Sequence, residues 1–171
     1  MKVSVSSHIN LPPAEVWHLV QTPQLLLFIA APLVRFAFLE PVPRTSFVSN
    51  ARYRARLMLF GILPFGTQWI VPSVHEQGKA AWPKRLRDNG YSVLIERWDH
   101  WITVEPDGAD TTRYTDEVEI RAGALTPFIW AFAQVFYRHR QRRWRLLAQI
   151  NSPGHHELRR VIGLTKNEVQ K

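Results

Sequence analysis

Hydrophobic and polar residues alternate along much of the chain, and the period lengthens in three places. Residues 2–9 alternate and predict a half-buried strand that opens the fold. Pro13 suits the first turn of a helix, so a short apolar helix is expected there. Residues 25–31 predict a second short helix or buried turn. After residue 123 the apolar positions recur at helical spacing, which predicts one long amphipathic helix over residues 125–149.

The middle of the chain, from residue 47 to residue 121, has the period of two that is typical of strands. We expect strands at residues 52–59, 67–75 and 84–89, with a turn at residues 61–66. Pro72 places the second of these strands at a sheet edge or a bulge. The strongest pair of strands covers residues 92–105 and 111–121, joined by a five-residue hairpin loop.

This order of elements indicates an α+β fold. A curved antiparallel sheet buries one face, and only the long C-terminal helix is large enough to cover it. A sheet that grips a helix tends to leave a gap, which is the default site for a small ligand. The chain is therefore predicted to be a single ligand-binding domain over residues 1–171, with a short helix and a frayed tail within residues 154–171.

The hairpin predicts which side chains share a face. If Glu105 opposes Thr111, one face carries the pairs Val104/Thr112, Ile102/Tyr114, His100/Asp116 and Trp98/Val118. This face is apolar apart from one histidine and one aspartate, about 5 Å apart at Cβ. Two interpretations stay open: a general base oriented by a carboxylate, or two buried polar groups that satisfy each other. The other face is mostly charged and is expected to meet water.

The long helix carries an unusual number of arginines. Arg140 and Arg143 fall on its apolar stripe, where a charge needs a partner or a wet cavity. Arg140 is expected to bind a ligand carboxylate or enolate, to pair with Asp116, or to extend past the end of the core. The run RHRQRRWR at residues 138–145 and the arginines of residues 52–56 also suit nucleic acid or anionic lipid. Because no recognised nucleic-acid motif accompanies them, a solvated surface is the preferred interpretation.

The amino-acid composition excludes several classes of protein and of functional site. The 171 residues are 46% hydrophobic and carry a formal net charge of +8. Cysteine is absent, which excludes disulfides, thiol nucleophiles and cysteine-ligated metals. We expect no membrane-spanning helix and no signal peptide, and a cytoplasmic location. Trp82 and Phe65 are candidates for gating a cavity or for ordinary loop packing. The cluster His155-His156-Glu157 lacks a third ligand at suitable spacing, so no metal site is expected.

The first strand and helix of the START-related, Bet v 1-like superfamily resemble the opening of this chain, VSVSSHINLPPAEVWHLVQTP. Bacterial members called SRPBCC or polyketide cyclase/dehydratase-like proteins are similar to residues 94–145, with RWDHWITVEPDG, RYTDEVEIRAG and FYRHRQRRWRLLA. The resemblance covers nearly the whole chain and is loose between residues 40 and 79. It implies a helix-grip fold, with a seven-stranded antiparallel sheet around the C-terminal helix and a hydrophobic pocket. The superfamily has no universal catalytic motif, so no catalytic residue is carried over.

Three hypotheses follow for function. In the first, the cavity binds a small hydrophobic or aromatic ligand, lipid- or polyketide-like, without a cofactor. In the second, the same cavity is a cyclase or dehydratase in which His100 is the base and Asp116 orients it. In the third, the arginines dock on nucleic acid or anionic lipid. Of these, the third is the remote alternative: the protein is expected to be a monomer or a homodimer, with no nucleic-acid partner and no integral membrane contact. The ligand-binding residues predicted for the first are Tyr53, Trp98, Ile102, Tyr114, Val118, Phe132, Phe136 and Arg140.

Overall fold

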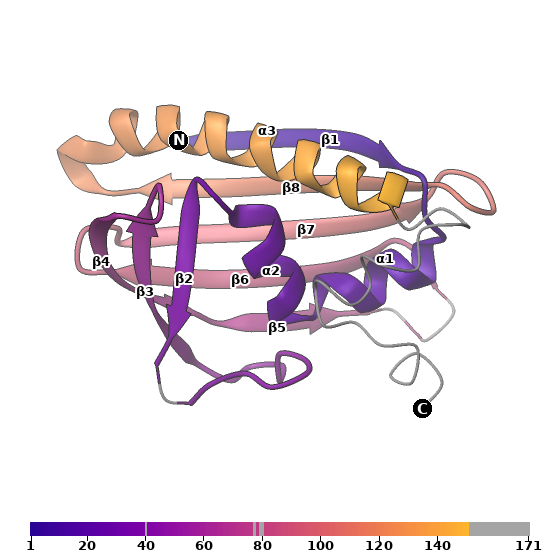
Figure 1. Ribbon diagram of the computed structural model, residues 1–171, viewed down its shortest axis with the longest axis horizontal. Coiled ribbons are helices and arrows are strands. Elements are labelled where there is room, and N and C mark those ends of the chain that lie inside the picture. Colours follow the sequence, from indigo (N-terminus) through magenta and orange to yellow (C-terminus); the bar gives the residue numbers. More distant parts are fainter. Residues whose placement is uncertain (40, 77, 79–80, 151–171) are drawn as a thin grey trace.

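The computed structural model describes residues 1–39, 41–76, 78 and 81–150, and the elements follow one another in the predicted order (Figure 1). They are β1 (Lys2–Ile9), α1 (Pro13–Val20), α2 (Pro23–Ala30), β2 (Val34–Phe38), β3 (Tyr53–Leu59), β4 (Leu63–Ile70), β5 (Pro72–His75), β6 (Lys84–Ser92), β7 (Arg97–Pro106), β8 (Thr112–Arg121), η1 (Gly123–Leu125) and α3 (Thr126–Ile150). The predicted short helix in the C-terminal tail and the His155-His156-Glu157 cluster lie outside the described residues.

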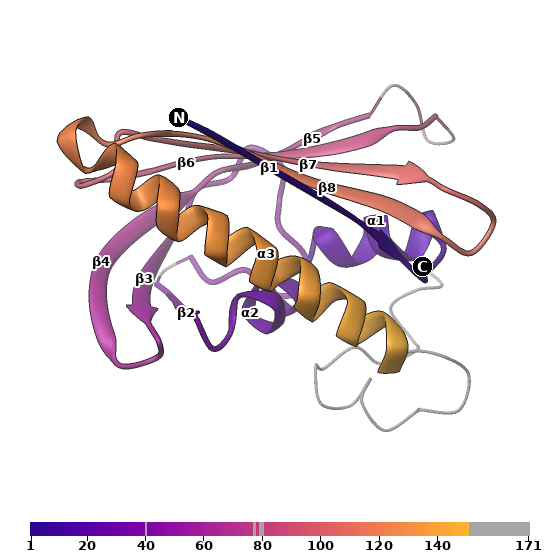
Figure 2. The same ribbon diagram turned by 90° about the horizontal axis from the view of Figure 1, so that it is seen from above.

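The strands form one antiparallel sheet in the order β1-β8-β7-β6-β4-β3-β2, and β5 pairs with β6 beside this path. The sheet curves so that β2, β3 and β4 turn toward α3, which crosses one face of the sheet (Figure 2). This is the helix-grip α+β fold, with eight strands where seven were expected. Figure 2 also shows α1 and α2 on the same side of the sheet as α3. No helix of the described residues is long and apolar enough to cross a membrane.

The core lies between the sheet and the three helices. The long helix buries one stripe of side chains against the sheet, at the helical spacing read from the sequence. Its buried members are Ala133, Phe136, Tyr137, Arg140, Gln141, Trp144, Leu147 and Ala148. One core cluster joins the end of this helix to α1, and a second joins its beginning to β2, β3 and β8.

One strand was not predicted, and two local expectations were wrong. The strand β2 was not foreseen, because VRFAF is short and follows an apolar run broken by Pro32. The turn expected at residues 61–66 is shorter, and Leu63 already begins β4, with Pro64 opposite Met58 where the register shifts. The strand expected from residue 92 begins only at Arg97, because Ser92 and Ile95 close a turn through a 2.8 Å backbone hydrogen bond.

The β7–β8 hairpin keeps a five-residue loop, but the loop lies one residue further along the chain than predicted. Pro106 pairs with Thr112, so His100 lies opposite Val118 and Asp116 opposite Ile102. The predicted register is therefore wrong by two residues. A two-residue shift preserves the faces, since side chains alternate with period two. His100 and Asp116 thus stay on the inner face as diagonal neighbours.

Candidate functional site

A cavity of about 280 Å³ lies between the inner face of the sheet, α2 and the first half of α3. Most of its wall is apolar, from β2, β3, β4, β6, β7 and both helices. Its polar or ionisable lining residues are Gln68, Asp88, His100, Tyr137 and Arg140. A largely apolar hollow with a few convergent polar groups is the usual form of a small-molecule site.

Asp116 is the centre of the polar group next to this cavity. It is fully buried, and its carboxylate accepts hydrogen bonds from His100 Nε2 at 2.8 Å, the Tyr114 hydroxyl at 3.0 Å and Gln141 Nε2 at 2.9 Å. Burial opposes ionisation of Asp116, but Arg140 and these donors outweigh it and hold its pKa below the ordinary value. The carboxylate is therefore ionised and acts as an acceptor only.

His100 presents its imidazole to the cavity while Asp116 holds one ring nitrogen. Burial lowers the pKa of His100, and the hydrogen bond to Asp116 opposes this shift without reversing it. The ring is then neutral at neutral pH, with the proton on Nε2 and a lone pair on Nδ1. The ring of Tyr137 packs against it at 4.9 Å between centroids. A neutral imidazole oriented by a carboxylate can accept a proton or a hydrogen bond from a ligand.

Arg140 connects the helix to the same group. Its side chain is buried, and Nη2 lies 3.4 Å from Asp116 Oδ1 and 3.4 Å from the Tyr114 hydroxyl. Burial disfavours its charge, but the nearby Asp116 carboxylate raises the pKa of Arg140 above its ordinary value. Of the three roles considered for this residue, the structure shows the pairing with Asp116. Since Arg140 also lines the cavity, a buried cation is available to a ligand oxygen.

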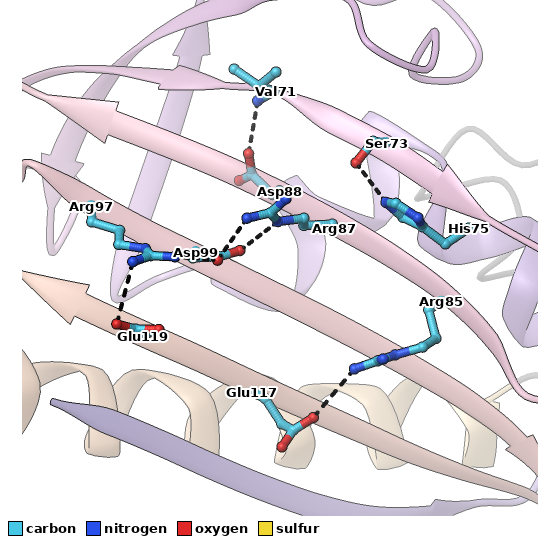
Figure 3. Close-up of polar contacts among 10 residues, drawn as sticks. All are labelled: Val71, Ser73, His75, Arg85, Arg87, Asp88, Arg97, Asp99, Glu117 and Glu119. Carbon is cyan, nitrogen blue, oxygen red and sulfur yellow. Dashed lines mark hydrogen bonds and ion pairs between the residues drawn. The ribbon is translucent and has the colours of Figure 1, made fainter.

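Asp88 is the site residue that sequence reasoning missed. It lies on β6 directly opposite His100 of β7, lines the cavity, and accepts a 2.7 Å hydrogen bond from the Val71 amide (Figure 3). Burial raises the pKa of Asp88 to about 7, against the hydrogen bond from Val71 and the charge of Arg140. Its neutral form places a carboxylic acid beside a neutral imidazole. A signal was present, because Lys84, Leu86 and Asp88 alternate on one face of the predicted strand.

Asp88→Asn is expected to remove a pH dependence of stability. The pKa of Asp88 is about 7 in the folded chain and about 4 when unfolded. The folded state then binds more protons between these values, so the stability that Asp88 contributes is lost as pH rises from about 4 to above 7. We expect the variant to exceed the parent by roughly 2–4 kcal/mol in free energy of unfolding at pH 8, and by little at pH 4. Urea unfolding at both pH values measures the difference, and an equal difference at both would contradict this assignment.

The structure brings some of the predicted residues to the cavity and keeps others away from it. Those that line it are Trp98, His100, Ile102, Phe132, Phe136 and Arg140. Tyr114 and Asp116 lie behind His100 and Arg140, and Val118 packs in the core cluster at the start of α3. Tyr53 packs with Ala55 and Ile70 in a third cluster. Phe65 lines the cavity, whereas Trp82 packs against the cluster near α1 and over Lys84.

The outer face of the hairpin was expected to meet water, but it holds its own ion pairs. Arg87 donates to both carboxylate oxygens of Asp99, at 2.7 and 2.8 Å, and Arg97 bridges Asp99 and Glu119 (Figure 3). Hydrogen bonds from Arg87 hold the pKa of Asp99 below its ordinary value, against the opposing effect of burial. The charge of Asp99 is thus balanced by two arginines.

Solved structures of low sequence identity share this fold. A START superfamily protein from Mycobacterium smegmatis is 12% identical with a TM-score of 0.56, covering 86% of this chain and 97% of its own. The Zhui aromatase/cyclase from Streptomyces sp. R1128 is 11% identical with a TM-score of 0.61, covering 91% and 98%. The di-domain ARO/CYC BexL of the BE-7585A biosynthetic pathway is 16% identical with a TM-score of 0.63, covering 90% of this chain and 48% of its own.

These identities are too low to transfer an activity, and they show a common fold alone. The predicted START-related, cyclase-like fold is confirmed. No curated protein matches the sequence. One family model does match, over residues 7–148, which is most of the chain and runs from the last residues of β1 to near the end of α3. The chain therefore belongs to the family described as Domain of unknown function (DUF8410).

Proposed function

We propose that the cavity binds a small, largely apolar or aromatic molecule, with one polar group of the ligand at the end formed by Asp88, His100 and Arg140. The observation that carries this proposal is that the polar and apolar side chains of the cavity wall are separated. Three ionisable side chains gather where β6, β7 and α3 meet, and apolar side chains make up nearly all the rest. Apolar contact supplies affinity in such a site, and the few polar groups orient the ligand.

Two unsatisfied donors support a polar ligand group at that end. Within the described part of the chain, Arg140 Nε and the Tyr137 hydroxyl are buried without a hydrogen-bond partner. Both residues line the cavity. Buried donors normally have partners, because an unmade hydrogen bond costs about 1–3 kcal/mol.

Native mass spectrometry of the protein purified from its own host tests the proposal. We expect a fraction of the protein to carry one additional small-molecule mass that organic solvent releases. A protein that carries no ligand after purification can still have a binding site. The same sample is therefore titrated with 1-naphthol, an aromatic probe with a single hydroxyl. Saturable binding with one site per chain is expected, and the absence of binding at millimolar probe would contradict the proposal.

The position of His100 supports a second candidate, a cyclase or dehydratase of polyketide-like substrates. With Nε2 held by Asp116, the Nδ1 lone pair is free to remove an acidic carbon-bound proton. Arg140 would stabilise the enolate that forms. His100→Gln keeps a side-chain amide donor for Asp116 but removes the base. If the protein is an enzyme, this variant retains ligand binding and loses turnover, whereas a carrier shows no turnover before or after the change.

A further inference from the structure

Three chain connections lie at one end of the molecule, and all three expose apolar side chains. Figure 2 shows the β6–β7 turn beside the β8–α3 connection and the β3–β4 turn apart from them. Antiparallel pairing of Arg97 with Arg121 puts the β6–β7 turn beside the β8–α3 connection. The pairing of Gln68 with Ser92 leaves the first half of β4 beyond the end of β6, so the β3–β4 turn projects from the same end. Both views show these connections at the left of the molecule (Figures 1 and 2).

We call this surface the apolar end and define it by seven exposed side chains from the three connections and the start of α3. Ile62 is 80% exposed, Val93 98% and Phe128 76%. The remaining members are Phe60, Leu63, Leu94 and Leu125. Single exposed apolar residues need no explanation, but this many gathered at one end indicate a contact surface.

The β2–β4 side of the apolar end is basic. The strands β2, β3 and β4 contain no aspartate or glutamate, and their exposed arginines are Arg35, Arg54 and Arg56. The Arg35 side chain lies against Gly61 at the tip of the β3–β4 turn. Glu96 is the one acidic residue in the three connections. This charge favours an anionic surface as the partner.

Aromatic side chains lie between the apolar tips and Arg54. Trp69 of β4 stacks on Tyr91 of β6 with ring centroids 6.4 Å apart, and the Arg54 guanidinium lies 6.0 Å from the Trp69 ring. Tyr91 is two residues before Val93, about 7 Å along an extended strand. At a membrane surface, apolar side chains lie deepest, tryptophan and tyrosine lie at the interface, and arginine lies at the phosphates. The side chains here follow the same order.

We propose that the apolar end docks on an anionic lipid bilayer, with Ile62 and Val93 inserted at the level of the acyl chains and the arginines at the phosphates. Phe128 belongs both to this surface and to the cavity wall. Docking would therefore bring the cavity next to the bilayer, where apolar molecules are concentrated. The docking itself does not depend on which ligand the cavity binds.

Sedimentation with vesicles tests this inference on the full chain. Vesicles of phosphatidylglycerol and phosphatidylcholine should bind the protein, and pure phosphatidylcholine vesicles should bind it much less. The double variant Ile62→Ser/Val93→Ser should lower the partition coefficient at least about tenfold. The matched control Val42→Ser/Val48→Ser changes exposed valines away from the three connections and should bind as the parent does.

Two results would overturn the docking proposal. One is anionic-vesicle binding that the double variant leaves unchanged. The other is self-association in the ultracentrifuge that the double variant abolishes while the parent fails to bind vesicles, which would assign the surface to a second copy of the chain. Neither Ile62 nor Val93 lines the cavity, so 1-naphthol binding to the double variant separates a failure of docking from a failure of the proposed function.

Discussion

Asp116→Leu is expected to lower the free energy of unfolding by about 3–5 kcal/mol. The substitution removes the carboxylate that accepts from His100, Tyr114, Gln141 and Arg140. The Arg140 cation then stays buried with no counter-charge, and desolvation of an unpaired charge costs far more than the loss of one hydrogen bond. Urea unfolding at pH 7, followed by tryptophan fluorescence and circular dichroism, measures the difference.

The matched control removes both charges. Asp116→Leu/Arg140→Met removes both members of this ion pair, so it should be markedly more stable than Asp116→Leu alone. If the double variant is as unstable as the sum of the two single changes, the loss comes from packing and the ion pair is not its cause. A loss below about 1 kcal/mol for the single change would mean that Asp116 is solvated in the folded protein.

Leu57→Trp is expected to weaken 1-naphthol binding at least about tenfold, without preventing folding. Leu57 lies on β3 and its buried side chain lines the cavity. An indole at this position would occupy space that the ligand needs. Inserting a larger side chain into a packed core costs about 1–3 kcal/mol, and here the cavity should absorb part of that strain. Isothermal titration gives the affinity, and thermal unfolding shows whether the variant is folded.

A leucine on the same side of the sheet supplies the control. Leu27 of α2 is exposed and does not line the cavity, so Leu27→Trp makes the same chemical change away from the ligand. This variant should bind 1-naphthol as the parent does. Equal affinity for the parent and the folded Leu57→Trp variant would show that the probe binds elsewhere.

Long periodic segments made much of the fold predictable from the sequence. The helix over residues 126–150 and the opening strand agree with their predicted ranges to within about one residue. The apolar residues of the helix recur at the helical period of 3.6 and those of the strand at the period of two, and each segment is long enough to exclude the alternative period. The cyclase-like resemblance added the arrangement of the sheet around the helix, which periodicity alone does not specify.

The site was predictable only where one hairpin determined it. A shift of the β7–β8 register by an even number of residues leaves His100 and Asp116 on the same face of the sheet. The predicted register was wrong by two residues, so the two side chains still meet. The contact between Arg140 and Asp116 was one of three alternatives, because helix position relative to the sheet was unknown. Asp88 was missed because the strand expected from residue 92 begins only at Arg97, so the turn that pairs β6 with β7 and places Asp88 opposite His100 was not predicted.

The claim on which the account depends is that the hollow between sheet and helix is a binding site with a polar end. A crystal structure of the protein with 1-naphthol tests it most directly. The account predicts one naphthol ring within the cavity, its oxygen within about 3 Å of His100 Nδ1 or the Asp88 carboxyl group. A hollow filled by the chain's own side chains, with naphthol bound only on the outer surface, would contradict it.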